Sequence, residues 1–188
     1  MNYFPAFIKL DNKKILIIGG GNIAKEKLEK LLDFTNNIAL ISLEFCDDIK
    51  KIINTHSLKY YQNRYKKGFI KDYDIVIVAL NDINLQKSIY KESRDYKVLF
   101  NAVDLPEFCD FIFPSYIKKG DFTVAISTSG TSPAFAKQFR IFLENIIPSD
   151  IEEFLKEMKN LRNTLPKGTK RMKLLEKKAK EYITHLLN

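Results

Sequence analysis

Three successive glycines are the feature of this 188-residue chain that most clearly indicates chemistry. Gly19-Gly20-Gly21-Asn22-Ile23-Ala24 fits G-x-G-x-x-A, directly after an apolar run and directly before a helical pattern. Gly19 would allow a tight turn, and Gly21 would let the backbone approach a pyrophosphate with no Cβ in the way. The start of the helix would add N–H groups and a partial positive charge. The alternative is a tight strand-to-helix turn that holds no ligand.

The ribose of a dinucleotide bound on this turn should meet the end of the second strand, where an acid about 20 residues beyond the glycines usually contacts it. Glu44 lies in that place, and no Lys or Arg occurs between residues 38 and 49. A 2′-phosphate would therefore face an anion with no nearby cation, which favours NAD over NADP. An equally good interpretation makes Glu44 an acid in the first turn of the next helix.

A loop carboxylate is the second candidate. Asp104 lies in Asn-Ala-Val-Asp-Leu-Pro, directly after a strand that should end at Phe100. Ligands of open parallel sheets bind outside the carboxyl ends of the strands, so Asp104 could face a substrate as a general base. Asp also stabilises turns, here before Pro106. From the residues alone the two interpretations have equal weight.

Hydroxyl residues precede a predicted helix in the second half of the chain. In Ser127-Thr128-Ser129-Gly130-Thr131-Ser132, hydroxyls and N–H groups at a helix start could hold an anion, although a plain N-cap is at least as good an explanation. His56 and His185 are far apart in sequence, and the two cysteines, Cys46 and Cys109, have no metal-ligand spacing. The sequence therefore predicts no metal site and two reduced thiols.

Alternating strands and helices must position these groups. Continuous apolar runs indicate strands buried on both faces, and 3.6-residue spacing indicates helices between them. This alternation predicts an α/β fold with a parallel sheet. The expected strands are 14–18, 38–41, 58–61, 74–80 and 97–100, and the expected helices are 22–34, 45–53 and 83–92.

The pattern changes in the second half. Residues 111–117 and 122–127 indicate a hairpin with Gly120 in its turn, and 133–146 indicates a helix that Ser132 caps and Pro133 begins. Two further helices are expected, with a break at residues 164–168. These patterns predict three parts, with boundaries at 1–112, 113–148 and 149–188.

Charge and composition limit the class of protein. The net charge is +8, and residues 151–188 hold ten Lys or Arg against five Glu. A nucleic-acid-binding module would explain that basic tail, but the chain shows no aromatic RNP motif, zinc spacing or recognition-helix signature. No apolar run is long enough to span a membrane, and the start of the chain does not read as a signal peptide. We therefore expect a cytoplasmic protein without membrane or nucleic-acid partners.

A series of motifs resembles one known family. The chain opens with FPAFIKLDNKKILIIGGG, continues with NAVD-x-P and FIFPS, and then reads STSGTSP before a helix. This series resembles the precorrin-2 dehydrogenase/sirohydrochlorin ferrochelatase family, the N-terminal type of sirohaem synthase. There are departures: Leu80 stands where Thr is common, and Thr128 where Ser or Gly is common.

The resemblance implies a homodimer built from an N-terminal Rossmann domain, a small α+β dimerisation region and a C-terminal helical region. It implies NAD-dependent oxidation of precorrin-2 to sirohydrochlorin, and in some members insertion of ferrous iron. A non-catalytic NAD-sensing module would keep the glycines without needing Asp104. The candidate sites are Gly19, Gly21, Asn22, Ile23, Leu43 and Glu44 for NAD, Ser115, Ser127, Thr128 and Ser129 for the tetrapyrrole, and Asp104 for catalysis.

Overall fold

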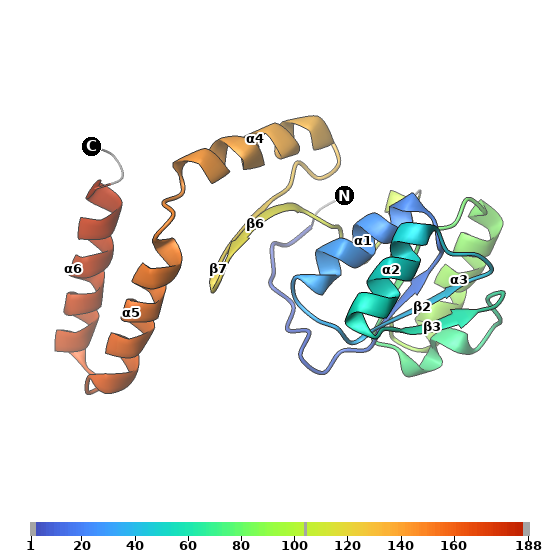
Figure 1. Ribbon diagram of the computed structural model, residues 1–188, viewed down its shortest axis with the longest axis horizontal. Coiled ribbons are helices and arrows are strands. Elements are labelled where there is room, and N and C mark those ends of the chain that lie inside the picture. Colours follow the sequence, from blue (N-terminus) through green and yellow to red (C-terminus); the bar gives the residue numbers. More distant parts are fainter. Residues whose placement is uncertain (1–2, 104, 186–188) are drawn as a thin grey trace. The chain divides into compact units, whose positions relative to one another are not determined.

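The computed structural model describes residues 3–103 and 105–185 and forms two compact units, Met1–Ile112 and Phe113–Asn188 (Figure 1). Within the second unit, the further division at residue 148 stays a prediction.

The first unit is built on a five-stranded parallel sheet in the order β3-β2-β1-β4-β5. In this order the chain runs outward from β1 on one side and from β4 on the other. All five strands lie where apolar runs predicted them, with each bound shifted by at most two residues. The strands are β1 (Ile15–Ile18), β2 (Ile38–Ser42), β3 (Lys59–Gln62), β4 (Ile75–Val78) and β5 (Leu99–Ala102).

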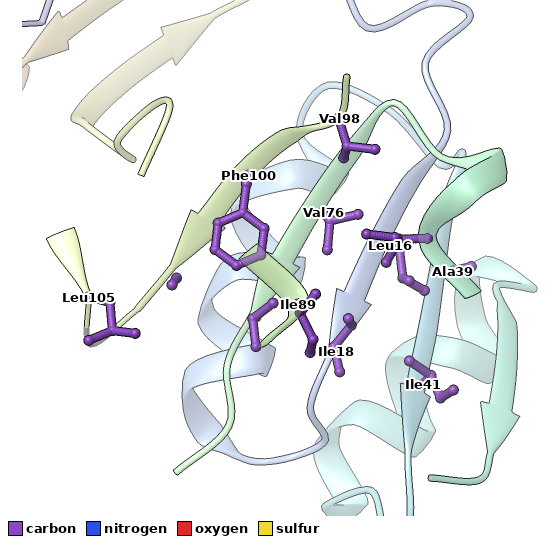
Figure 2. Close-up of a cluster of buried hydrophobic side chains, with 12 residues drawn as sticks. Leu16, Ile18, Ala39, Ile41, Val76, Ile89, Val98, Phe100 and Leu105 are labelled. Carbon is purple, nitrogen blue, oxygen red and sulfur yellow. The ribbon is translucent and has the colours of Figure 1, made fainter. Parts of the chain in front are cut away.

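The central strands are apolar on both faces because helices cover both faces. Every residue of β1 and β4 is buried. Leu16 and Ile18 pack in one cluster with Phe100 and with Ile89 of α3 (Ile83–Asp95), as Figure 2 shows. Alternation along a strand turns their neighbours Ile15 and Ile17 to the opposite face.

Helices α1 (Asn22–Leu32) and α2 (Asp47–His56) follow β1 and β2 and lie nearer the viewer in Figure 1, with α3 behind the sheet. The predicted start of α2 at Phe45 was too early. Phe45 is buried, and Cys46 is the N-cap residue, so the apolar side chain before the helix was misread as part of it. The α/β class with a parallel sheet is confirmed.

The second unit begins with a hairpin of β6 (Ser115–Lys119) and β7 (Phe122–Ile126), with Gly120 at φ 57° in its turn. The expected strand at 111–117 therefore starts four residues later. α4 (Pro133–Ile146) has the predicted bounds, and the Ser132 hydroxyl accepts the N–H of Phe135 at 3.2 Å.

The chain ends in a helical hairpin, α5 (Ile151–Thr164) and α6 (Thr169–His185), broken where the sequence predicted. The rings of Phe154 and Tyr182 stack with centroids 4.0 Å apart, and the Tyr182 hydroxyl donates to Asp150 at 2.7 Å. Partial burial first, and then this hydrogen bond, raise the pKa of Tyr182 to about 12.

Candidate functional site

The carboxyl edge of the sheet gathers the residues that the sequence singled out for the cofactor. Gly19 follows β1 directly, Leu43 follows β2, and Ala79 follows β4. The chain runs from β1 toward β2 and from β4 toward β5, in opposite directions, and open α/β sheets bind ligands at the carboxyl edge where the strand order reverses in this way.

Gly19 makes the turn that leaves β1. Its φ is +136°, and a Cβ built on it would lie 2.3 Å from the carbonyl oxygen of Ala79. Its N–H donates to the Ile41 carbonyl at 2.9 Å, and the N–H of Ala79 donates to the Ile18 carbonyl at 2.8 Å. Gly19 is therefore needed for the close packing of three strand ends.

Gly20 has a role that the sequence analysis missed. A Cβ at this position would lie 1.9 Å from the carbonyl oxygen of Glu44 and 2.8 Å from the Ser42 hydroxyl oxygen. The Gly20 carbonyl also accepts the N–H of Cys46 at 2.8 Å. This glycine joins the first turn to the loop after β2. Its only signal in the sequence was that the middle residue of the motif is also glycine.

Gly21 differs from both, because a Cβ there would meet nothing within 4 Å. It is the N-cap residue of α1, its φ is an ordinary −95°, and neither a side-chain cap nor an acid occupies the first turn of the helix. Asn22 and Ile23 follow it and are exposed. An open backbone surface at an uncapped helix start fits the pyrophosphate of a dinucleotide.

The loop after β2 decides one alternative. Leu43 and Glu44 are exposed, and α2 starts only at Asp47, with Asp47 and Asp48 as the acids of its first turn. Glu44 is therefore not a first-turn helix acid. It lies in the loop next to the glycine turn, where a ribose contact was expected.

A cation that the sequence analysis left out lies near this loop. The N–H of Asn63 donates to the carbonyl of Ser42 at 2.9 Å, so the chain leaving β3 runs beside the end of β2. Arg64 follows directly, although it lies far along the sequence from residues 38–49, which contain no Lys or Arg. The preference for NAD over NADP consequently rests on Glu44 outweighing Arg64.

The end of β5 leads toward the candidate carboxylate. Asn101 and Ala102 are buried, and Val103 donates its N–H to Val78 at 3.2 Å. Asp104 lies outside the described residues. Leu105, the next residue along the chain, is buried in the core cluster.

The remaining candidates lie in the second unit. Ser115 pairs with Ile126 in the hairpin, so Ser127 follows beside it. The Ser127 hydroxyl oxygen accepts the N–H of Ser129 at 3.0 Å, and that of Thr128 accepts the N–H of Ser132 at 3.0 Å. These two oxygens thus hold the loop in shape, and their O–H groups remain able to donate.

Two other expectations can be compared with the structure. His56 is the exposed last residue of α2, and the side chain of His185 lies outside the description. Within residues 3–103 and 105–185 no cluster of three or more His, Cys, Asp or Glu could hold a metal ion. Cys46 and Cys109 are both free thiols.

A family model described as "Putative NAD(P)-binding" matches residues 6–115, which contain the whole parallel sheet and the glycine turn. The chain belongs to this family. The matched residues include the turn after β1, where two sterically required glycines precede one that leaves its backbone open.

Curated relatives carry the resemblance further. A sirohaem synthase of Pseudoalteromonas translucida is 32% identical over 151 residues, which are 80% of this chain and 32% of that protein. One from Buchnera aphidicola is 31% identical over 193 residues, covering 100% of this chain and 41% of that protein. The chain therefore spans well under half the length of these relatives. The resemblance to the precorrin-2 dehydrogenase/sirohaem synthase family seen in the motifs is confirmed.

A solved structure named SirC, precorrin-2 dehydrogenase, matches 98% of both chains with a TM-score of 0.76 and 19% identity. This similarity covers both units of the present chain and shows that each has the same fold as the corresponding part of that structure. Among the described residues, no helix has both the length and the apolar character to cross a membrane.

Proposed function

We propose that this protein is a dehydrogenase that oxidises precorrin-2 to sirohydrochlorin with NAD during sirohaem synthesis. The observation that carries the proposal is the glycine turn at the reversal point of a 3-2-1-4-5 sheet, in a chain whose relatives are sirohaem synthases. The name of the similar solved structure, a precorrin-2 dehydrogenase, agrees with it.

NAD, when bound, supplies the hydride acceptor. Gly21, Asn22 and Ile23 would hold its pyrophosphate through backbone N–H groups at the uncapped start of α1, while Gly19 shapes the turn. Leu43 and Glu44 would contact the adenosine side at the exposed loop after β2. NAD is proposed rather than NADP because the Glu44 carboxylate would repel a 2′-phosphate.

Asp104 is the proposed general base. A base must accept a proton from the substrate carbon framework as the hydride departs, and a carboxylate at the carboxyl end of β5 is on the ligand-binding edge of the sheet. The proposal rests on its position in the sequence after β5; of its described neighbours, Val103 donates its N–H to the Val78 carbonyl and Leu105 is buried.

The tetrapyrrole substrate carries many carboxylates, which hydroxyl donors can bind. Ser115, Ser127, Thr128 and Ser129 are proposed for this role, because Ser115 and Ser127 lie at the same end of the hairpin. The described contacts of Ser127 and Thr128 use their oxygens as acceptors and leave the O–H groups for a ligand. Insertion of ferrous iron as a second substrate remains a prediction from the family resemblance.

We also propose that the protein is a cytoplasmic homodimer without membrane or nucleic-acid partners. A stripe on α4 supports the dimer: four large apolar side chains spaced by four, three and four residues are exposed on one face of the helix. Burying such a stripe against a second copy would remove apolar area from water. Its members are Phe135, Phe139, Phe142 and Ile146.

The direct test is an anaerobic assay of the purified protein with precorrin-2 and either NAD or NADP. We expect NADH to accumulate together with the sirohydrochlorin spectrum, and NADP to be the poorer acceptor. Tight NAD binding without turnover would instead indicate an NAD-sensing module, and no NAD binding at all would remove the cofactor assignment. Ferrous iron added after the first reaction then tests for chelation.

A further inference from the structure

The segment after β5 leaves the sheet and returns to it. The N–H of Asp110 donates to the Phe100 carbonyl at 2.8 Å, and the N–H of Phe100 donates to the Asp110 carboxylate at 2.8 Å. Two hydrogen bonds thus join residues that are ten positions apart. The segment that they close contains Asp104.

Arg94 of α3 fixes the returning end. Its guanidinium contacts both carboxylate oxygens of Asp110, at 2.6 and 2.9 Å, and also donates to the carbonyl of Val98 at 3.0 Å. It lies over the ring of Tyr90, with 4.8 Å between the guanidinium carbon and the ring centroid. A two-point ion pair of this kind fixes orientation as well as distance. Arg94 therefore connects a helix, the start of β5 and the far end of the segment.

Contacts inside the segment strengthen the closure. The Cys109 thiol donates to the Ala102 carbonyl at 3.1 Å and accepts the N–H of Ala102 at 3.3 Å. The buried side chain of Asn101 donates to the carbonyl of Phe111 at 2.8 Å. The backbone is thus held on both sides of Asp104.

We propose that Arg94 and Asp110 are positioning residues, which hold the described residues on either side of Asp104, Val103 and 105–109, so that Asp104 can act. This inference rests on the proposed function of Asp104. A functional group must be held within about 0.5 Å of its working position by its supporting contacts. Arg94 and Asp110 themselves would touch neither substrate nor cofactor.

The test compares Asp110→Asn and Arg94→Gln with a matched control, Asp74→Asn. Asp74 also pairs with a cation, Lys13 at 2.8 Å, and its carboxylate also accepts a backbone N–H, from Lys14 at 2.9 Å. It lies before β4 at the same amino edge of the sheet, and its backbone carbonyl accepts the N–H of Leu99, but its side chain binds the residues before β1. The control therefore removes the same kind of ion pair and hydrogen bond, but it leaves the contacts of Arg94 and Asp110 intact.

Asp110→Asn and Arg94→Gln should each lower kcat with precorrin-2 about 10- to 100-fold, the usual effect of misplacing a catalytic group by on the order of 1 Å. NAD affinity and KM should stay near the parent values. Amide hydrogen exchange over residues 103–109 should become about tenfold faster, since a charged hydrogen bond that opposed local opening is gone. Arg94→Lys, which keeps the charge without the two-point geometry, should recover part of the lost kcat. Asp74→Asn should show neither change.

The two readouts separate this inference from the proposed function. If the parent protein does not oxidise precorrin-2, the proposed function fails. Hydrogen exchange alone then decides whether Arg94 and Asp110 hold the segment after β5. Unchanged exchange in Asp110→Asn and Arg94→Gln would overturn the inference. An active parent with unchanged kcat in both variants would overturn it as well, and so would an equal loss of kcat in Asp74→Asn.

Discussion

At the turn after β1, three identical residues have three different surroundings. Side chains at Gly19 and Gly20 would overlap carbonyl oxygens of neighbouring loops, whereas a side chain at Gly21 would point into open space. The first two glycines therefore serve the fold, and the third leaves room for a ligand. This difference allows binding and stability to be changed separately.

Gly21→Val should abolish NAD binding and leave the melting temperature near that of the parent, because its φ of −95° suits any residue. Gly20→Ala should destabilise the protein by about 1–3 kcal/mol or more, since the added methyl group cannot be packed without moving the Glu44 carbonyl. Thermal unfolding and NAD titration of both variants check this. A folded Gly21→Val protein with unchanged NAD affinity would refute the pyrophosphate assignment.

Asp104→Asn tests the proposed base. Asn keeps the shape of Asp but cannot accept a proton as a carboxylate does, so NADH formation from precorrin-2 should slow by about 10²–10⁴-fold. NAD affinity and stability should stay close to normal. The turn-stabilising interpretation expects the opposite, since Asn also favours turns. A rate within a few-fold of the parent would make Asp104 a structural residue.

Among the elements, the sequence predicted those whose signal is local. Ser132 and Pro133 marked the start of α4, and the apolar runs marked the buried strands, because both effects act between near neighbours. Gly19 and Gly21 were likewise found by spacing. The packing of Gly20 against Glu44 was not predictable, because residues 24 positions apart meet only in the folded sheet. The same reason hid the pairing of Arg94 with Asp110.

One ion pair ties the starts of two central strands. Asp74 precedes β4 and binds the side chain of Lys13 and the N–H of Lys14, which precede β1. The Lys13 ammonium first, and then the Lys14 N–H, hold the pKa of the Asp74 carboxyl below its ordinary value of 3.8. The charged carboxylate therefore stabilises the folded state above that value. This contribution is lost as the pH falls through the lower, folded-state pKa.

Asp74→Asn should accordingly lower the free energy of unfolding by about 1 kcal/mol at neutral pH, the usual worth of a partly exposed charged contact. The difference from the parent should hold between pH 7 and about pH 5 and shrink below the ordinary pKa. Urea unfolding of both proteins across this range checks the dependence. A difference that grows toward acid pH would contradict the assignment.

For the whole molecule, the α4 stripe tests the proposed dimer. Phe139→Lys places a charge in the middle of the stripe and should shift the protein from dimer to monomer in sedimentation experiments, because burying an unpaired charge costs several kcal/mol. Gln138→Lys adds the same charge at the adjacent exposed position and should leave the dimer intact. Equal sedimentation of the two variants as dimers would exclude this face as the interface.

The central place of β1 also has a consequence for how the chain folds. β1 leaves the ribosome before both of the strands it pairs with, β2 and β4, and its register with β4 joins Ile15 to Ile75. One edge of an entirely apolar strand therefore stays unpaired until some sixty further residues have been synthesised. Long-range pairing of this kind slows folding, and an open apolar edge invites association with other chains. Nascent chains ending before β4 should accordingly depend most on chaperones.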